Sequence, residues 1–308
     1  MRCARPSAVA SGSGVSTRFV PVAAPYRLDL TVAVLRRFST NIVDVVAPDG
    51  TYARVLAGSH TPVLVTVRQF EPAALVVEAN GEPGDDERAF ALAHRMLGVD
   101  RTTAGFDAGA RRIPWLRALA RRMRGVKPPR YPTLWEACVN AIVFQQISLL
   151  AASSILRRTI VALGSPREYA GLALHAFPTI DTVAGAPDAS LREAGLSAGK
   201  VATLRRIAES LGSGALDEAM LEERPSPAAA ALLCTIKGIG PWTAAVILLR
   251  GLGRLDVFPA NDSGVARGLA ALAGADVEVA PALETLGSER GMLYYHLLLA
   301  RLEARGEI

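Results

Sequence analysis

Apolar residues are spaced differently in the first part of the chain from the way they are spaced in the rest. Between Phe19 and about position 80, short runs rich in β-branched residues alternate with turn signals such as Pro48-Asp49-Gly50. These runs predict strands at 28–32, 41–46, 51–57, 63–67 and 74–78, with a helical stretch near 34–38. Connections as short as these are typical of antiparallel strands. With a helix expected over 86–97, the pattern predicts a small α+β domain at residues 18–105.

From about position 107 onward the strand pattern disappears, and apolar residues recur at helical spacing. One short helix ends at the glycine stop Gly195. We expect the other helices at 113–124, 134–163 (one helix or two), 200–211, 228–236, 242–249, 262–273 and 290–305. No segment recurs at a fixed period, which argues against a solenoid. The fold class that follows is α+β, with a small N-terminal antiparallel-sheet domain and an all-α body.

Composition excludes several classes of protein. Half of the 308 residues are hydrophobic and 20% are charged, which excludes intrinsic disorder for most of the chain. No apolar run is long enough to span a membrane, and the N-terminal segment lacks the apolar core of a signal peptide. We therefore expect a cytoplasmic protein with a flexible tail at residues 1–17. Cys3, Cys138 and Cys234 are too few and too far apart for a disulfide framework or a metal cluster.

The charge balance favours a polyanionic partner. Lysine and arginine exceed aspartate and glutamate by 34 to 29, which gives a net charge of +5. The densest positive stretch runs from Arg111 to Arg130, and it is either a solvated helix face with a basic linker or a surface that faces DNA. The histidines show no ligand spacing, and we interpret His296, on an apolar helix, as a core residue. We expect no metal catalysis and no organic cofactor.

The most informative segment runs from Leu233 to Ala245. There a predicted helix ends, Gly238-Ile239-Gly240 turns sharply, and Pro241 occupies the first turn of the next helix, where its missing N–H is not needed. The glycines permit a backbone that a Cβ would block, and the N–H groups of the turn and of the helix start form an anion site suited to a nucleic-acid phosphate. A Gly-x-Gly turn alone is equally compatible with an ordinary connection between helices.

An apolar, proline-containing connection follows the second helix of this hairpin and delivers Asp262 to the start of another helix. At such a position the carboxylate caps the helix by accepting backbone N–H bonds, which favours its ionised form. Asp256 and Asn261 are acidic and amide neighbours in the same connection. A carboxylate held in this way is a candidate catalytic group.

Together these elements resemble the helix-hairpin-helix DNA glycosylases, and among them the 3-methyladenine DNA glycosylase II group. The matching segments are the hairpin (238–244), the end of its second helix (250–251) and the loop that leads to Asp262 (256–262). A glutamine-containing segment upstream (141–148) and a glycine/lysine helix start (196–201) also match. The resemblance extends over nearly the whole chain from about residue 20. It implies a helical lobe at 134–254 that contains the hairpin, and a second lobe formed by 106–133 and 255–308 that carries the aspartate.

The reaction implied by this resemblance is hydrolysis of the N-glycosidic bond between a damaged base and deoxyribose, in base excision repair. A fixed carboxylate stabilises the oxocarbenium-like transition state and orients or deprotonates the attacking water. The resemblance assigns this role to Asp262, whereas Asp256 is interpreted as a loop residue. Bifunctional members place a lysine where this chain has Trp242, so the resemblance implies a monofunctional enzyme that does not nick the strand.

Further site residues follow from the same resemblance. Trp242, Phe144, Gln145 and Gln146 are expected at the base pocket or the duplex, and Gln146 holds the position of an apolar wedge in the best-known members. A buried core tryptophan and amides that satisfy helix ends remain the alternatives. The expected phosphate contacts are Gly238, Ile239, Gly240, Thr243 and Lys237. The hairpin of the family also binds Na⁺ or K⁺ through backbone carbonyls, which correspond here to those of Cys234, Ile236 and Gly238.

The expected partner is double-stranded DNA that contains damaged bases, bound by a monomer that is cytoplasmic, nucleoid-associated and independent of membranes. Val246 and Ser263 depart from the closest group, which places aromatic residues there. Alkylated purines are the expected substrates, and a deaminated or oxidised base is the alternative within the same reaction class. An alternative from a different class is a non-catalytic DNA-binding module that uses the hairpin only to bind phosphates.

Overall fold

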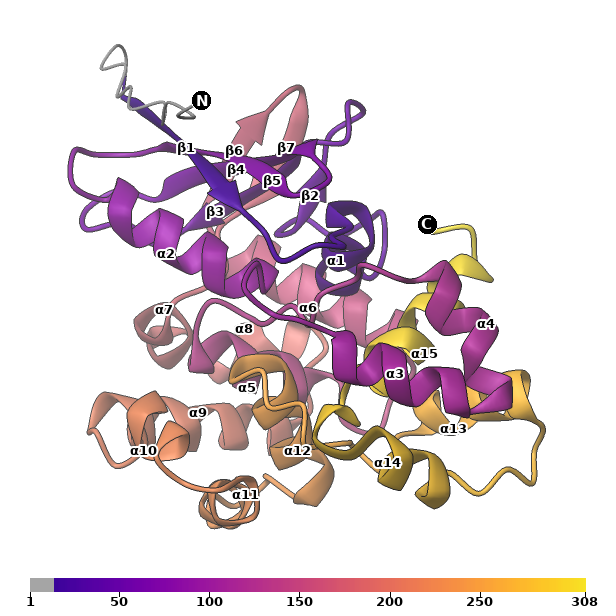
Figure 1. The fold of residues 1–308 in the computed structure, drawn as a ribbon. Coiled ribbons are helices and arrows are strands. Elements are labelled where there is room, and N and C mark those ends of the chain that lie inside the picture. Colours follow the sequence, from indigo (N-terminus) through magenta and orange to yellow (C-terminus); the bar gives the residue numbers. More distant parts are fainter. Residues whose placement is uncertain (1–13) are drawn as a thin grey trace, which may run out of the picture.

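A five-stranded antiparallel sheet forms the N-terminal part of the computed structural model, which describes residues 14–308. Its order is β1-β5-β4-β3-β2, and its strands are β1 (Val15–Pro21), β2 (Val45–Val46), β3 (Tyr52–Leu56), β4 (Val63–Glu71) and β5 (Ala74–Asn80). Val63, Val65 and Val67 alternate along β4 and are buried in one core with residues of α2 (Asp86–Leu97). The predicted antiparallel sheet and the predicted helix at 86–97 are confirmed (Figure 1).

The segment after β1 is a helix, so the strand predicted at 28–32 is wrong. α1 spans Leu28–Arg36, and every residue from Leu28 to Leu35 except Asp29 is buried. The helix packs between the sheet and the helical body and contributes side chains to the hydrophobic cores of both. Leu28, Leu30 and Val32 alternate with Asp29 and Thr31, which is the period of a half-buried strand, but in the structure only Asp29 among them is exposed.

Two other N-terminal expectations need correction. Of the strand predicted at 41–46, only Val45 and Val46 pair in β2, because the Asn41 carboxamide oxygen accepts the N–H groups of Val43 at 2.8 Å and Asp44 at 3.0 Å and forms a turn. Residues 1–13 of the flexible tail predicted at 1–17 lie outside the described residues. Residues 15–17 belong to β1 and pair with β5.

Helices make up most of the remaining chain (Figure 1). They are α3 (Ala104–Arg112), α4 (Pro114–Arg122), α5 (Leu134–Val143), α6 (Leu149–Leu163), α7 (Ile180–Gly185), α8 (Asp188–Glu193), α9 (Ala198–Gly212), α10 (Glu218–Glu222), α11 (Ser226–Cys234), α12 (Pro241–Gly251), α13 (Ser263–Ala273), α14 (Ala280–Leu286) and α15 (Met292–Glu303). The predicted region 134–163 is two helices. Across residues 14–308, no helix combines the length and the apolar character that crossing a membrane requires.

The helical body has two hydrophobic cores. One is built mainly by α5, α9, α11 and α12, and the other by α3, α4, α13, α14 and α15 together with one face of α1. α12 contributes to both, since Leu248 belongs to the first core and Leu249 to the second. The lobe boundaries at 134–254 and at 106–133 with 255–308 stay a prediction.

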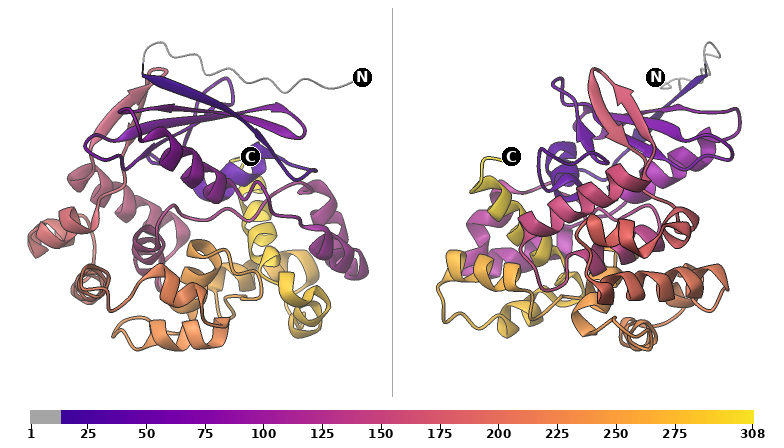
Figure 2. Two further views of the ribbon diagram at one scale, coloured as in Figure 1. Left: turned by 60° about the vertical axis from the view of Figure 1, so that its left-hand side comes forward. Right: turned by 180° about the vertical axis from the view of Figure 1, so that it is seen from behind.

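One strand pair lies inside the helical body, where the sequence predicted no strands. β6 (Pro166–Tyr169) and β7 (Leu172–His175) form an antiparallel hairpin after α6. The hairpin lies against the five-stranded sheet in both views of Figure 2, and Leu174 is buried with Val45, Ala53 and Val55. These strands escaped prediction because each is only four residues long and β6 is mostly exposed.

A buried ionic network joins the sheet to α5. The Arg54 guanidinium pairs with Asp44 at 2.6 Å and with Glu136 at 2.5 Å, and Tyr52 donates its hydroxyl to Asp44 at 2.8 Å. Burial raises the pKa of Glu136, and the positive charge of Arg54 opposes this effect. Two carboxylates thus neutralise one buried cation between the two parts of the molecule.

Candidate active site

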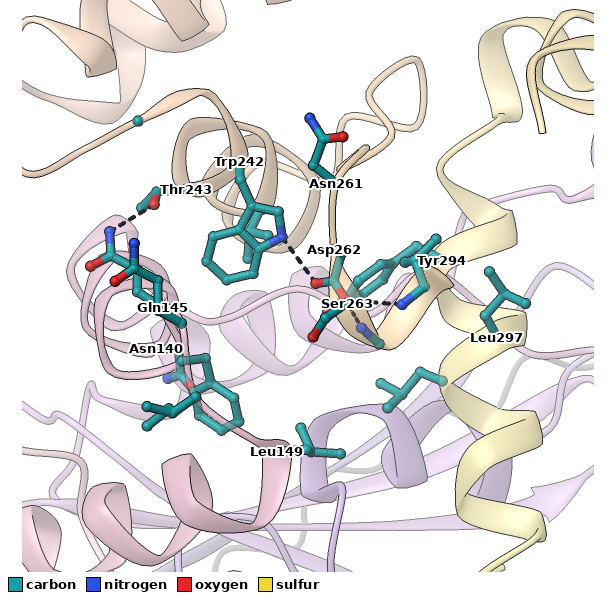
Figure 3. A pocket seen from close by; sticks show the side chains of 18 of the residues that line it. Asn140, Gln145, Leu149, Trp242, Thr243, Asn261, Asp262, Ser263, Tyr294 and Leu297 are labelled. Atoms are coloured by element: carbon teal, nitrogen blue, oxygen red, sulfur yellow. Dashed lines mark hydrogen bonds between the residues drawn. The ribbon is translucent and has the colours of Figure 1, made fainter. Parts of the chain in front are cut away.

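A cavity of about 670 Å³ lies where the turn after α5, the hairpin between α11 and α12, and the helices α13 and α15 meet. Figure 3 shows Trp242 and Asp262 pointing toward each other in this cavity, with Asn140 and Gln145 on the α5 side and Tyr294 on α15. Of the residues predicted from sequence, the lining includes Phe144, Gln145, Gln146, Gly238, Ile239, Gly240, Trp242, Thr243 and Asp262. The structure therefore brings together segments that are more than a hundred positions apart in the sequence.

Asp262 is the N-cap of α13, as the sequence predicted. Its Oδ1 accepts the backbone N–H groups of Gly264 at 2.6 Å and Val265 at 2.9 Å, and its Oδ2 accepts the indole N–H of Trp242 at 2.9 Å. Asn261 precedes it with a φ of 63°, in the left-handed region, and turns the chain into the helix. The carboxylate is held in one orientation and sits at the positive end of a helix dipole.

The hairpin requires one of its glycines for steric reasons. Gly238 has a φ of 103°, and a Cβ at this position would lie 2.0 Å from the Thr203 hydroxyl oxygen of α9. Gly240, with a φ of −100°, is the N-cap of α12 and has open space where a Cβ would be. Pro241 begins α12 in its first turn, as predicted. The predicted helix-hairpin-helix is therefore present, and Gly238 alone of its two glycines is fixed by contact.

Gln145 connects the turn after α5 to the hairpin. Its carboxamide nitrogen donates to the Gly238 carbonyl at 2.9 Å and to the Thr243 hydroxyl at 2.8 Å. The Lys200 ammonium donates to the carbonyls of Val143 at 2.8 Å and Gln145 at 3.0 Å, and burial lowers the pKa of this lysine. Gln145 thus donates hydrogen bonds to acceptors of the hairpin. A structural amide of this kind is one of the alternatives that the sequence left open.

Gln146 differs from its neighbour because it is exposed and its backbone is in the left-handed region, with a φ of 56°. Trp242 is half-buried, so it is a wall of the cavity and not a core residue. Phe144 is also half-buried and lines the same cavity. Their roles toward a base or a duplex stay predictions.

The predicted phosphate contacts divide into two groups. Lys237 and Gly238 are exposed at the tip of the hairpin. Thr243 is 2% exposed and accepts the Gln145 hydrogen bond, and the N–H of Ile239 donates to the Ile236 carbonyl at 3.0 Å. The Thr243 hydroxyl and the Ile239 N–H are thus both engaged inside the hairpin, and the phosphate contacts of these residues stay predictions.

Several residues of the cavity carry no motif, and sequence reasoning missed them. They are Arg37 after α1, Asn140 on α5, and Arg301 on α15. Burial lowers the pKa of Arg301, and the like charges of Arg267 and Arg305 add to this effect. No local sequence signal points to these residues, because only the packing of distant helices brings them to one cavity.

Two other predictions concern residues away from the cavity. His296 is buried, its Nδ1 lies 2.8 Å from the Met292 carbonyl, and burial lowers its pKa to about 4, so it is a core residue as predicted. Among residues 14–308, no group of three or more histidine, cysteine or acidic side chains is arranged to hold a metal ion. The arginines of α3 and α4 are exposed, while Lys127 is 1% exposed.

Comparisons with known proteins agree with this geometry. Residues 139–286 match the HhH-GPD superfamily of base excision DNA repair proteins. A probable bifunctional transcriptional activator/DNA repair enzyme AlkA of Mycobacterium tuberculosis is 31% identical over 265 residues, which are 84% of this chain and 51% of that protein. A DNA-3-methyladenine glycosylase of Bacillus subtilis is 30% identical over 172 residues, 56% of this chain and 57% of that protein.

The chain thus spans about half the length of these curated relatives. The structure of a 3-methyladenine DNA glycosylase from Archaeoglobus fulgidus aligns over 94% of this chain and 100% of its own chain, at 25% identity and a TM-score of 0.77. The complex of an 8-oxoguanine glycosylase/lyase from Clostridium acetobutylicum with DNA has the same fold at 17% identity, with a TM-score of 0.74. Together with the hairpin and the capping aspartate, these matches show that the chain belongs to the HhH-GPD superfamily of base excision DNA repair proteins.

Proposed function

We propose that the chain is a monofunctional DNA glycosylase that hydrolyses the N-glycosidic bond of damaged bases, with alkylated purines as its main substrates, and leaves an abasic site. The observation that carries the proposal is Asp262, fixed at the start of α13 beside Trp242 in the cavity. The relatives from B. subtilis and A. fulgidus carry names of this activity, which supports the same substrate class here.

The geometry of Asp262 suits an oxocarbenium-like transition state. As the glycosidic bond breaks, its electron pair leaves with the base, and the carboxylate stabilises the positive charge that develops on the sugar. Water then forms a bond to C1′ and releases its proton to the carboxylate or to solvent. Oδ1 already accepts two backbone N–H groups, whereas Oδ2 accepts one indole N–H. Oδ2 therefore retains the capacity to accept a hydrogen bond from the water.

The monofunctional mechanism is supported by the positions of the lysines. Within residues 14–308, no lysine lines the cavity. Trp242 occupies the position of the nucleophile of bifunctional members, and the ammonium of Lys200 is engaged by two backbone carbonyls. Without an accessible amine near Asp262, the chain has no group that forms a Schiff base with the sugar.

Duplex DNA is the proposed partner, bound by a monomer. The hairpin presents Gly238 and Lys237 at its exposed tip, and the start of α12 adds the positive end of a helix dipole. Gln146, exposed at the rim of the cavity with its strained backbone, is the proposed plug for the space that a flipped base leaves. A polar plug fills this space while offering a hydrogen bond to the unpaired base.

A monovalent cation, Na⁺ or K⁺, is part of the proposal. The carbonyl of Ile236 accepts the Ile239 N–H at 3.0 Å, and that of Gly238 accepts from Gln145 at 2.9 Å. Each carbonyl oxygen keeps a second lone pair, so together with that of Cys234 the set fits a hard monovalent ion. Such an ion would add positive charge beside a DNA phosphate.

The test is release of free base from methylated duplex DNA by the parent protein and by Asp262→Asn, analysed by chromatography. We expect 7-methylguanine or 3-methyladenine from the parent and a loss on the order of a hundredfold or more in the variant, with affinity for an abasic duplex retained. A parent that releases neither base but acts on uracil, hypoxanthine or 8-oxoguanine duplexes would be a glycosylase for another lesion. A parent that binds DNA without releasing any base would be a binding module.

A further inference from the structure

One wall of the cavity is formed by Arg37, which lies outside the matched superfamily region at 139–286. Arg37 follows α1 as its C-cap, with a φ of 60°. This left-handed conformation is uncommon for a residue with a side chain, and strained positions of this kind cluster at binding sites. The conformation is held by the N–H of Arg37, which donates to the Ala33 carbonyl at 2.8 Å.

The guanidinium of Arg37 is buried but only partly hydrogen-bonded. The residue is 7% exposed, and its cation lies 4.0 Å from the centre of the Phe144 ring. One terminal nitrogen donates to the Tyr131 hydroxyl at 3.0 Å, and Nε has no hydrogen-bond partner among the described residues. Arginine carries five N–H donors and remains charged, and the bond to Tyr131 uses one of them, so this side chain keeps unused donors beside the cavity it lines.

The charge of Arg37 also lacks a neutralising partner. Arg54, a buried arginine of β3, is paired with two carboxylates, whereas no carboxylate of residues 14–308 forms an ion pair with Arg37. Burial lowers the pKa of Arg37, and the positive charge of Arg250 adds to this effect. A buried, unpaired cation is unfavourable for stability alone. A ligand that brings an acceptor into the cavity would relieve this cost.

We propose that Arg37 donates to the exocyclic oxygen of a 6-oxopurine held in the cavity, so that 7-methylguanine and hypoxanthine are preferred over 3-methyladenine. This inference rests on the glycosylase activity proposed above and assigns its substrate class. Phe144 places its ring beside the same guanidinium, so a base that reaches Arg37 also meets an aromatic surface. An adenine derivative has an amino group at position 6, which cannot accept the hydrogen bond and would leave the guanidinium unpaired.

The same contact assists bond breaking. When the bond between C1′ and N9 breaks, its electron pair passes to the purine ring and is delocalised onto O6. A cation that donates to O6 stabilises this negative charge, while Asp262 stabilises the positive charge on the sugar and water supplies the new bond to C1′. The effect is larger for hypoxanthine, which departs as an anion, than for 7-methylguanine, which is already positively charged in the nucleotide.

The experiment compares two bases released from one sample of methylated duplex DNA. For Arg37→Met we expect release of 7-methylguanine to fall about tenfold or more, because this variant loses the hydrogen bond to O6. Release of 3-methyladenine, which makes no such bond, should stay within about threefold of the parent. Arg254→Met is the control, since Arg254 is a half-buried arginine that donates to the carbonyls of Leu221 and Glu222 and does not line the cavity. Its ratio of the two released bases should equal that of the parent.

The outcomes separate the two proposals. An equal fall of both bases, or no change in either, overturns the role of Arg37 while the glycosylase activity stands. A parent that releases no base overturns the activity itself. If Arg37→Met does not fold, inhibition of the parent by free bases decides the question. Hypoxanthine should inhibit more strongly than adenine, from which it differs at position 6, and equal inhibition would overturn the proposal.

Discussion

Two polar networks in this molecule differ in how completely their charges are neutralised. Between the sheet and α5, Arg54 pairs with Asp44 and Glu136. In the cavity, Asp262 accepts hydrogen bonds from two backbone N–H groups and one indole, and the cation of Arg37 has no carboxylate partner among residues 14–308. In the first network the cation is paired with carboxylates of the protein, although Nε of Arg54 has no hydrogen-bond partner among residues 14–308. In the second network, an acidic and a basic group on the walls of one cavity can each form further hydrogen bonds.

The comparison distinguishes a structural network from a site for a ligand. Removing a charge from water is costly, so an ion that serves the fold is expected to be paired inside it. Groups that bind a substrate have to keep hydrogen-bond donors or acceptors free for it, and ionisable groups with perturbed pKa values therefore cluster at functional sites. On this basis, changes in the first network should appear in stability, and changes in the second should appear in activity and DNA binding.

The largest expected effect on stability comes from removing an ion pair of the first network. Glu136→Ala removes one of the two carboxylates that bind the buried Arg54, which leaves one terminal nitrogen of the guanidinium without an acceptor. We expect the free energy of unfolding to fall by about 3–5 kcal/mol, measured by denaturant titration.

Glu78→Ala is the control for this prediction. The side chains of Arg68 and Glu78 lie 3.5 Å apart and are 54% and 36% exposed, and Glu78 also accepts from the Thr66 hydroxyl at 3.2 Å; the loss of so exposed a pair should change stability by less than about 1 kcal/mol. Similar losses in the two variants would show that burial does not distinguish these pairs, and the comparison between the networks would lose its basis.

A smaller effect is expected where the hairpin packs on α9. Gly238→Ala introduces a Cβ 2.0 Å from the Thr203 hydroxyl oxygen in a backbone with a φ of 103°. We expect a loss of about 1–3 kcal/mol in stability and weaker binding to an abasic duplex, measured by fluorescence anisotropy.

Gly240→Ala tests whether this effect comes from the contact or from any added methyl group. A Cβ on Gly240 meets no atom within 4 Å, and its φ is −100°. This variant should retain the stability of the parent to within about 1 kcal/mol. If Gly240→Ala is as damaging as Gly238→Ala, the steric explanation is wrong.

The hairpin and Asp262 could be predicted because their signals are local. A glycine turn, a proline in the first helical turn and a capping aspartate each act within a few residues, and each is where the sequence indicated. The N-terminal sheet was predicted for the same reason, from alternation and turn residues.

The rest depends on packing between distant segments. α1 begins with Leu-Asp-Leu-Thr-Val, which alternates as a strand does, and only its packing against two cores at once makes it a helix. Arg37 and Arg301 reach the cavity from opposite ends of the chain, so no spacing in the sequence connects them to Asp262. Thr243 stands beside the hairpin glycines in sequence, yet its hydroxyl turns inward to Gln145.

The smallest effect tests the one side-chain hydrogen bond that Asp262 receives. Trp242→Phe keeps an aromatic wall but removes the indole N–H that donates to Oδ2 at 2.9 Å. We expect the single-turnover rate of base release to fall about tenfold, as the loss of one hydrogen bond to a charged group predicts. Affinity for an abasic duplex should not change, because Lys237 and Gly238 at the exposed tip of the hairpin are unaltered.

Trp135→Phe provides the matched control within the same chain. The Trp135 indole donates to the Pro178 carbonyl at 2.9 Å, but this tryptophan is buried in a core and does not line the cavity. Its replacement should lower stability by about 1 kcal/mol and leave the rate of base release unchanged. If both variants slow base release equally, Trp242 acts through packing alone. A slower rate for Trp242→Phe only would show that its indole positions the carboxylate.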